Sequence, residues 1–279
     1  MSQFIAYLKM SRVSNLPTVW GNCLLAMTAI GNFTWSHFAM VSAICSLFYV
    51  AGMILNDVCD SEIDRKERPQ RPIPSGIVKR HTALLVATLI LLSAIFIYEF
   101  IYAYPSLWQT LAPLALAAVI VLYDVWHKGN NFSPFIMAAC RFMVYIVAAL
   151  SIASYPTQNI IVMAAVAASY IVGLTYMAMQ ENLYKVKNYW PALFLALPFL
   201  YAAIHQAQII YIVIAFLWVL YNIFLLYNKR IKNAIGGLIA GICFVDAMLL
   251  STVSSTESLP YFFVLFVCTF FAQKFIPGT

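Results

Sequence analysis

The sequence predicts an all-α integral membrane protein, and three observations support this fold class. Hydrophobic residues make up 63% of the 279 residues and charged residues only 9%, whereas a soluble domain typically carries about 25% charged residues. The mean hydropathy is +0.86. Ten apolar runs, wide enough as helices to cross roughly 30 Å of hydrocarbon, follow one another with no soluble domain between them. We therefore expect one polytopic membrane domain over residues 1–279.

The apolar runs are expected to form the spans in chain order. They cover residues 16–33, 38–55, 82–102, 107–123, 134–153, 160–178, 190–204, 209–227, 235–250 and 260–275. No small-residue cleavage site follows the short amphipathic start of the chain, so we expect no cleavable signal peptide, and the first run serves as signal and span together. The seventh run is short for a span.

The basic residues predict the orientation of these spans. All of them except Arg141, which falls within a span, precede the first span or follow the second, fourth, sixth, eighth and tenth: Lys9, Arg12, Arg65, Lys66, Arg68, Arg71, Lys79, Arg80, Lys128, Lys185, Lys187, Lys229, Arg230, Lys232 and Lys274. The opposite loops contain no Lys or Arg. The positive-inside rule therefore puts the basic side in the cytoplasm. This asymmetry accounts for the net charge of +6, which does not indicate a nucleic-acid partner.

Charge is otherwise concentrated in residues 56–76, which hold five of the ten acidic residues. If this stretch continues the preceding helix, Asp57, Asp60 and Asp64 share one face, because they are three and four residues apart. Such close carboxylates repel one another unless a cation lies between them, and they suit hard cations such as Mg²⁺. A solvated acidic loop is the alternative. The stretch directly follows an apolar span, however, where ionisable groups are costly and usually functional.

The same stretch resembles a known family signature. Asn56, Asp57, Asp60 and Asp64, followed by Pro69, Arg71, Pro72, Pro74 and Gly76, are similar to the N-D-x-x-D-x-x-x-D and P-x-R-P-x-x-x-G segments of the UbiA superfamily of intramembrane prenyltransferases. Residues 123–130 and 176–181 are similar to its EboC-type subgroup. The resemblance implies a UbiA-like bundle of nine to ten transmembrane helices, in which one of the last four apolar runs is a broken or re-entrant helix.

The resemblance also implies roles for individual residues. Asp57, Asp60 and Asp64 would ligate Mg²⁺ and act in catalysis, with Asn56 assisting at the metal and the diphosphate. Arg71 would bind diphosphate, and Lys128, in the loop after the fourth span, would be a further diphosphate ligand and catalytic residue. The prolines and Gly76 would form a stiff turn over the site, because Pro restricts the backbone and Gly permits positive φ. His127 is a possible acceptor-side base or a plain interfacial histidine.

The chain departs from the family pattern after the sixth span. Most members resemble D-x-x-x-D there, but this chain offers Gln180, Glu181, Asn182 and Lys185. A possible second acidic site would combine Glu181 with Asp246 and Asp124; alternatively, Lys185 replaces part of the metal charge, or the loop no longer serves ionisation. Asp124 could instead cap its helix or pair with Lys128.

Two ionisable residues lie deep inside predicted spans, away from the span ends. Arg141 is in the fifth span and Asp246 in the ninth, and ionisable groups at membrane depth usually face the bundle interior. They could pair with each other as a structural bridge. Alternatively, each faces the cavity, with Arg141 on the diphosphate, and this is the arrangement we favour.

These observations predict a Mg²⁺-dependent membrane prenyltransferase with its site open to the cytoplasm. It would move an isoprenyl group from a prenyl diphosphate to an unidentified acceptor, either an aromatic ring or a lipid alcohol. Metal and fixed cations would stabilise the leaving diphosphate. A non-catalytic carrier of a prenyl lipid is the alternative, suggested by the altered loop at Glu181, although a carrier has little use for a metal and diphosphate site.

Overall fold

The computed structural model describes residues 2–31, 33–102, 105–179, 189–253 and 257–278, and all the regular structure in these ranges is helical. The elements are α1 (Gln3–Met10), η1 (Val13–Asn15), α2 (Leu16–Ile30), α3 (Trp35–Cys59), α4 (Ser61–Glu67), α5 (Arg80–Phe100), α6 (Leu107–Trp126), α7 (Ser133–Leu150), α8 (Gln158–Ala178), α9 (Ala192–Ile204), α10 (Ile209–Tyr227), α11 (Ile231–Ala240), α12 (Ile242–Leu250), η2 (Ser251–Val253) and α13 (Leu259–Ala272).

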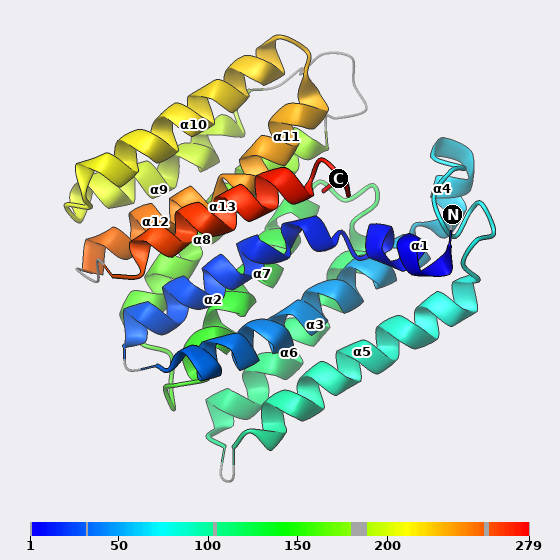
Figure 1. Cartoon of the computed structure of the whole chain (residues 1–279), viewed down its shortest axis with the longest axis horizontal. Helices are drawn as coiled ribbons and strands as arrows, with labels where there is room; N and C mark the ends of the chain where they lie inside the picture. The colour runs from blue at the N-terminus through cyan, green and yellow to red at the C-terminus, as the bar shows by residue number, and fades with distance from the viewer. Residues whose placement is uncertain (1, 32, 103–104, 180–188, 254–256, 279) are drawn as a thin grey trace.

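The long helices run side by side and form one bundle (Figure 1). α3 packs between α2 and α5, α7 packs against α2, α6 and α8, and α9 lies on α8. α12 and α13 pack on α2 and so connect the end of the chain to its beginning. α1, α4 and the C-terminus lie at the same end of the bundle (Figure 1). That end also holds the last turn of α3, where the acidic stretch begins.

Seven helices within the described residues are long and apolar enough to cross a membrane: α3, α5, α6, α7, α8, α10 and the α11–η2 segment. This confirms the expected all-α multi-pass protein. The first, seventh and tenth predicted spans are shorter than expected, because α2 has 15 residues, α9 has 13 and α13 has 14. The ninth predicted span is interrupted at Gly241, between α11 and α12.

The buried side chains and the exposed ones both fit a membrane environment. Tyr98 and Tyr170 are fully buried, and their hydroxyls donate to the carbonyls of Val147 and Leu238, each at 3.0 Å. These bonds satisfy polar groups that would be costly to leave unpaired in hydrocarbon. α5 and α10 carry rows of exposed large apolar side chains, which suits helices whose outer face meets lipid.

Two adjacent glycines of α11 differ in the space around them, and this predicts different effects of alanine. A Cβ at Gly237 would overlap Oδ1 of Asn222, which is 1% exposed, whereas a Cβ at Gly236 would meet only the end of the Gln273 side chain, at 3.1 Å. Alanine is better than glycine in a helix by about 1 kcal/mol, and overpacking a core costs about 1–3 kcal/mol. We expect Gly236→Ala to be neutral or stabilising and Gly237→Ala to be destabilising, as measured by thermal unfolding in detergent. Equal melting temperatures for the two variants would contradict this packing.

Candidate functional site

The acidic stretch lies where α3 gives way to α4. Asp57 is in the last turn of α3, Asp60 joins the two helices, and Asp64 is in α4. Backbone hydrogen bonds of 2.9 Å run from Asp60 N–H to the Asn56 carbonyl and from Asp64 N–H to the Asp60 carbonyl. The helix is interrupted at Asp60, where ψ is −10°, although these two hydrogen bonds have the helical spacing of four residues. All three carboxylates are buried, at 6%, 4% and 2% exposure.

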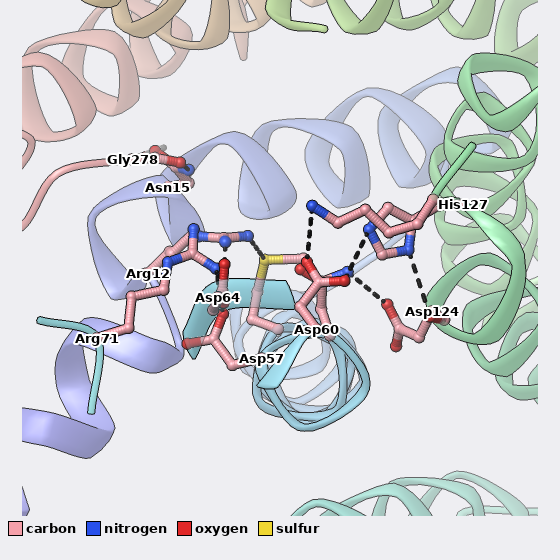
Figure 2. A network of polar contacts seen from close by, with 12 residues as sticks. Arg12, Asn15, Asp57, Asp60, Asp64, Arg71, Asp124, His127 and Gly278 are labelled. Carbon is pink, nitrogen blue, oxygen red and sulfur yellow. Dashed lines mark hydrogen bonds and ion pairs between the residues drawn. The ribbon is translucent and has the colours of Figure 1, made fainter. Parts of the chain in front are cut away.

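Asp57 and Asp64 share one arginine. Nη1 of Arg71 lies 2.7 Å from an Asp64 oxygen and 3.3 Å from an Asp57 oxygen (Figure 2). Such charge-assisted bonds are strong when they are shielded from water. Gly76, at φ 77°, ends the turn that carries Arg71, and the Val78 N–H closes that turn on the Pro72 carbonyl at 3.1 Å. The expected turn is present and presents Arg71 to the acidic residues.

Arg12 is a member of this group that the sequence analysis treated only as a topology charge. Its Nη2 lies 3.6 Å from the same Asp57 oxygen, and its Nη1 contacts the Met53 sulfur at 3.0 Å. Arg12 adopts φ 42° between α1 and η1, an unusual conformation for a residue other than glycine. No spacing rule links Arg12 to residues 45 positions away, so only packing of the N-terminal segment on α3 reveals this contact.

Asp60 is paired with other cationic side chains than Asp57 and Asp64. The loop after α6 places His127 Nε2 3.2 Å and Lys128 Nζ 3.5 Å from its two oxygens. Burial would raise the pKa of Asp60, but the His127 hydrogen bond and the nearby positive charges outweigh burial and lower it. Burial would lower the pKa of His127, but the bond to Asp60 and the charge of Asp60 raise it. Because the Nδ1 of His127 also faces backbone carbonyls, both ring nitrogens act as donors, as in the charged imidazolium.

Asp124 belongs to the same neighbourhood. Asn56 Nδ2 donates to Asp124 Oδ1 at 3.2 Å, while Asp124 Oδ2 is buried with no hydrogen-bond partner among the described residues. The pairing of Asp124 with Lys128 that was considered from the sequence is not formed, because the ion pair of Lys128 is with Asp60. The Tyr123 ring stacks on His127 with centroids 4.9 Å apart. Asp124 therefore lies beside the acidic group, which is formed by Asp57, Asp60 and Asp64.

Mg²⁺ would find suitable donors in this group, although the side chains are arranged as ion pairs. The oxygens of Asn56, Asp57, Asp60 and Asp64 are the hard ligands that Mg²⁺ prefers, and the free Asp124 Oδ2 is a further buried acceptor. Within the described residues, no three His, Cys, Asp or Glu side chains are arranged as a metal site. A bound cation would therefore compete with Arg71 and His127 for the same oxygens.

Arg141 and Asp246, deep inside their spans, belong to a second polar group, in which Asn22 of α2 is the connecting residue. Asn22 Oδ1 accepts from Arg141 Nη1, and its Nδ2 donates to Asp246 Oδ2, both at 2.7 Å. Tyr145 donates to Asp246 Oδ1 at 2.6 Å. Arg141 and Asp246 are thus linked through Asn22 and do not form the direct ion pair considered from the sequence. The sequence analysis did not identify Asn22, because a single Asn in a span has no distinctive pattern.

An apolar cavity separates the two polar groups. It has a volume of about 70 Å³, and its lining includes Tyr49, Gly52, Tyr123, Asp124 and Arg141. Arg141 therefore faces the cavity, as expected. Asp246 is 0% exposed and is not part of this lining, so the expectation that it also faces the cavity was wrong: hydrogen bonds hold it between α2 and α7. Glu181, Gln180, Asn182 and Lys185 lie outside the described residues, and the second acidic site that would include them stays a prediction.

Comparisons with known proteins identify similar sequences and folds. A family model described as the UbiA prenyltransferase family matches residues 14–190. A protein named digeranylgeranylglyceryl phosphate synthase from Methanocaldococcus jannaschii is 27% identical over 134 residues, which are 47% of this chain and 47% of that protein. One of the same name from Thermococcus gammatolerans is 32% identical over 154 residues, covering 44% of this chain and 55% of that protein. The chain thus spans about half the length of the curated relatives it matches.

Two solved structures share the fold. A UbiA homolog from Aeropyrum pernix K1, in its apo form, superposes with a TM-score of 0.64 at 15% identity and covers 85% of this chain and 96% of that one. A structure described as giving insights into the biosynthesis of digeranylgeranylglyceryl phosphate synthase in membranes superposes with a TM-score of 0.53 at 21% identity, over 98% of this chain and 97% of that one.

Proposed function

We propose that this chain, which belongs to the UbiA prenyltransferase family, is a Mg²⁺-dependent transferase that moves a prenyl group from a prenyl diphosphate to an acceptor. The observation that carries the proposal is the group of buried carboxylates, each paired with a cationic side chain, beside an apolar cavity. A diphosphate on a long apolar chain has the chemistry to occupy both. Residues 1–279 would form one catalytic domain.

The polar end of the substrate would meet the acidic group. Mg²⁺ held by Asn56, Asp57, Asp60 and Asp64 would neutralise charge that develops on the departing diphosphate. Arg71 and Lys128 supply fixed positive charge at the same place, and Arg71 is positioned by the turn that ends at Gly76. Arg141 projects into the cavity from the other side, where Asn22 orients its guanidinium.

The allylic end of the substrate would lie at the cavity, which at about 70 Å³ is too small for a whole prenyl chain. The cavity lining is mainly aliphatic and aromatic, with Phe48, Tyr49 and Tyr123 supplying rings. Aromatic faces attract cations, and a dry cavity protects a reactive allylic cation from water. The lining therefore suits the intermediate that cleavage of an allylic diphosphate produces.

The acceptor would be a lipid alcohol. The relatives are named digeranylgeranylglyceryl phosphate synthases, and these names favour a lipid alcohol over an aromatic ring. We also propose that the acidic group faces the cytoplasm. Arg65, Lys66, Lys79 and Arg80 lie in the same connection between α3 and α5 as the acidic stretch, and the positive-inside rule assigns such loops to the cytoplasm.

Metal removal tests this function directly. Purified protein in detergent would be incubated with radiolabelled prenyl diphosphates of several chain lengths and a lipid extract from its own cells, with Mg²⁺ or with EDTA. We expect a labelled lipid that forms with Mg²⁺ and is absent with EDTA, because the carboxylates cannot hold a diphosphate without a cation between them. Equal product with EDTA would contradict the metal requirement. Binding of the diphosphate without product, even with native extract, would support the carrier.

A further inference from the structure

A groove separate from the apolar cavity opens at the end of the bundle that also holds the acidic group. It has a volume of about 810 Å³ and lies between residues 67–71, α10, α11 and the chain end at 273–278. We call it the basic groove, because among the described residues that line it the charged ones are Arg68, Arg71, Arg230, Lys232, Lys274 and the single acid Glu67. Arg71 is paired with Asp57 and Asp64, and the other four cations outnumber Glu67, so the groove is an electropositive surface that attracts anions.

The walls of the basic groove are partly aromatic. Trp218 and Tyr221 of α10 and Phe270 of α13 line it, and Lys274 Nζ lies 4.6 Å from the Phe271 ring centroid. Trp218 is fixed by a 2.8 Å bond from its Nε1 to the Gly237 carbonyl. Phe270 near the end of α13 and Lys274 beyond it form an aromatic and cationic pair of the kind typical of the membrane interface, whereas Trp218 lies in the middle of α10. A ligand with an anionic head and an apolar body would contact both kinds of surface.

The edges of the basic groove are held in place. Asn15 Nδ2 donates to the Gly278 carbonyl, and Gln273 Nε2 donates to Asn15 Oδ1, both at 3.0 Å. These bonds attach the end of the chain to the start of α2, near Arg12 (Figure 2). Arg71 lines the groove while its guanidinium contacts Asp57 and Asp64. The groove is therefore a formed pocket that adjoins the acidic group through one shared arginine.

We propose that the basic groove binds the phosphate head of an anionic membrane lipid, whose apolar part lies against Trp218, Tyr221 and Phe270. Guanidinium and ammonium groups recognise phosphate oxygens by charge-assisted hydrogen bonds. Basic residues next to spanning helices attract anionic lipids. A soluble phosphate would use the cations but leave the aromatic wall without a partner. The proposal concerns binding alone and does not depend on prenyl transfer.

Lipid titration of the full chain tests the proposal. Protein in a neutral detergent with EDTA would be titrated by calorimetry with dioctanoyl phosphatidic acid, dioctanoylglycerol and inorganic phosphate. We expect saturable binding of the phosphatidic acid and at least tenfold weaker binding of the other two. Arg230→Gln combined with Lys232→Gln should weaken phosphatidic acid binding by at least about tenfold. Equal affinity for inorganic phosphate would identify a free-anion site and overturn the lipid assignment.

Matched variants distinguish lipid binding in the basic groove from attraction by the net charge of the protein and from binding at the acidic group. Lys79→Gln combined with Lys229→Gln removes two basic side chains that are exposed and do not line the groove, so it should change the affinity less than about twofold. Asp60→Asn should lower transfer but leave phosphatidic acid binding intact, because Asp60 contacts His127 and Lys128 and does not line the groove. Equal losses in both double variants would show attraction by net charge alone and overturn the proposal.

Discussion

Replacement of Asp60 by asparagine is expected to lower prenyl transfer at least about a hundredfold. Outer-shell partners of a metal site typically account for about 10–100-fold in affinity or activity, and Asp60 is proposed as a ligand itself. Asparagine has nearly the same shape but lacks the negative charge that Mg²⁺, His127 and Lys128 would meet. The measurement is Mg²⁺-dependent formation of labelled lipid from radiolabelled prenyl diphosphate.

The fold should tolerate this change. Lys128 has a side chain that is 43% exposed and can turn to water, and His127 can lose its proton when its acidic partner is removed. We therefore expect thermal unfolding in detergent close to that of the natural chain. Glu62→Gln is the matched control, because Glu62 is an exposed carboxylate in the same segment whose ion pair is with Arg65 at 3.3 Å. Full transfer activity in Asp60→Asn, or an equal loss of activity in Glu62→Gln, would contradict the assignment of Asp60 as a metal ligand.

Replacement of Asn22 by alanine is expected to be the most destabilising of these changes, at about 2–4 kcal/mol. Asn22 is 0% exposed and makes three hydrogen bonds of 2.7 Å, to Arg141, Asp246 and Tyr145. A buried polar group left without its partner costs about 1–3 kcal/mol, and more if it is charged. Removing one member of such a network can also cost more stability than the sum of its separate hydrogen bonds suggests.

Thermal unfolding and prenyl diphosphate binding, measured together, test the role of Asn22. Asn228→Ala is the control, because Asn228 is exposed at the end of α10 and makes one local bond to the Phe224 carbonyl. We expect Asn22→Ala to melt earlier and also to bind prenyl diphosphate less tightly, since Arg141 loses the acceptor that aims it at the cavity. An Asn22→Ala protein as stable as Asn228→Ala would show that the hydrogen bonds of Asn22 contribute nothing to the stability of the fold.

The membrane fold was predictable from local features. Apolar runs long enough to span a bilayer predict helices, because lipid leaves the backbone no other partners, and the seven long helices confirm this. Their ends were less predictable. α9 has only 13 residues and the ninth span is interrupted at Gly241. Helix ends are set by turns and by packing against neighbours, which hydropathy does not record.

Part of the candidate site was also readable in the chain. The spacing of Asp57, Asp60 and Asp64 brings their carboxylates near one another, because residues three and four apart lie close on a helix. The Pro-rich segment after them predicted a turn, and the turn presents Arg71. The likeness to the EboC-type subgroup, the roles of these residues in catalysis and the second acidic site stay predictions.

The partners of these residues come from elements far away in the sequence. Arg12 reaches Asp57 from the N-terminal segment, His127 reaches Asp60 from the loop after α6, and Asn22 joins Arg141 to Asp246 across three helices. Local spacing in the sequence determines the helices, the acidic face and the turn, because those features depend on residues that are neighbours in the chain. Which cation faces which carboxylate, and which buried groups share hydrogen bonds, depends on how the helices pack, and only the folded chain brings those side chains within bonding distance.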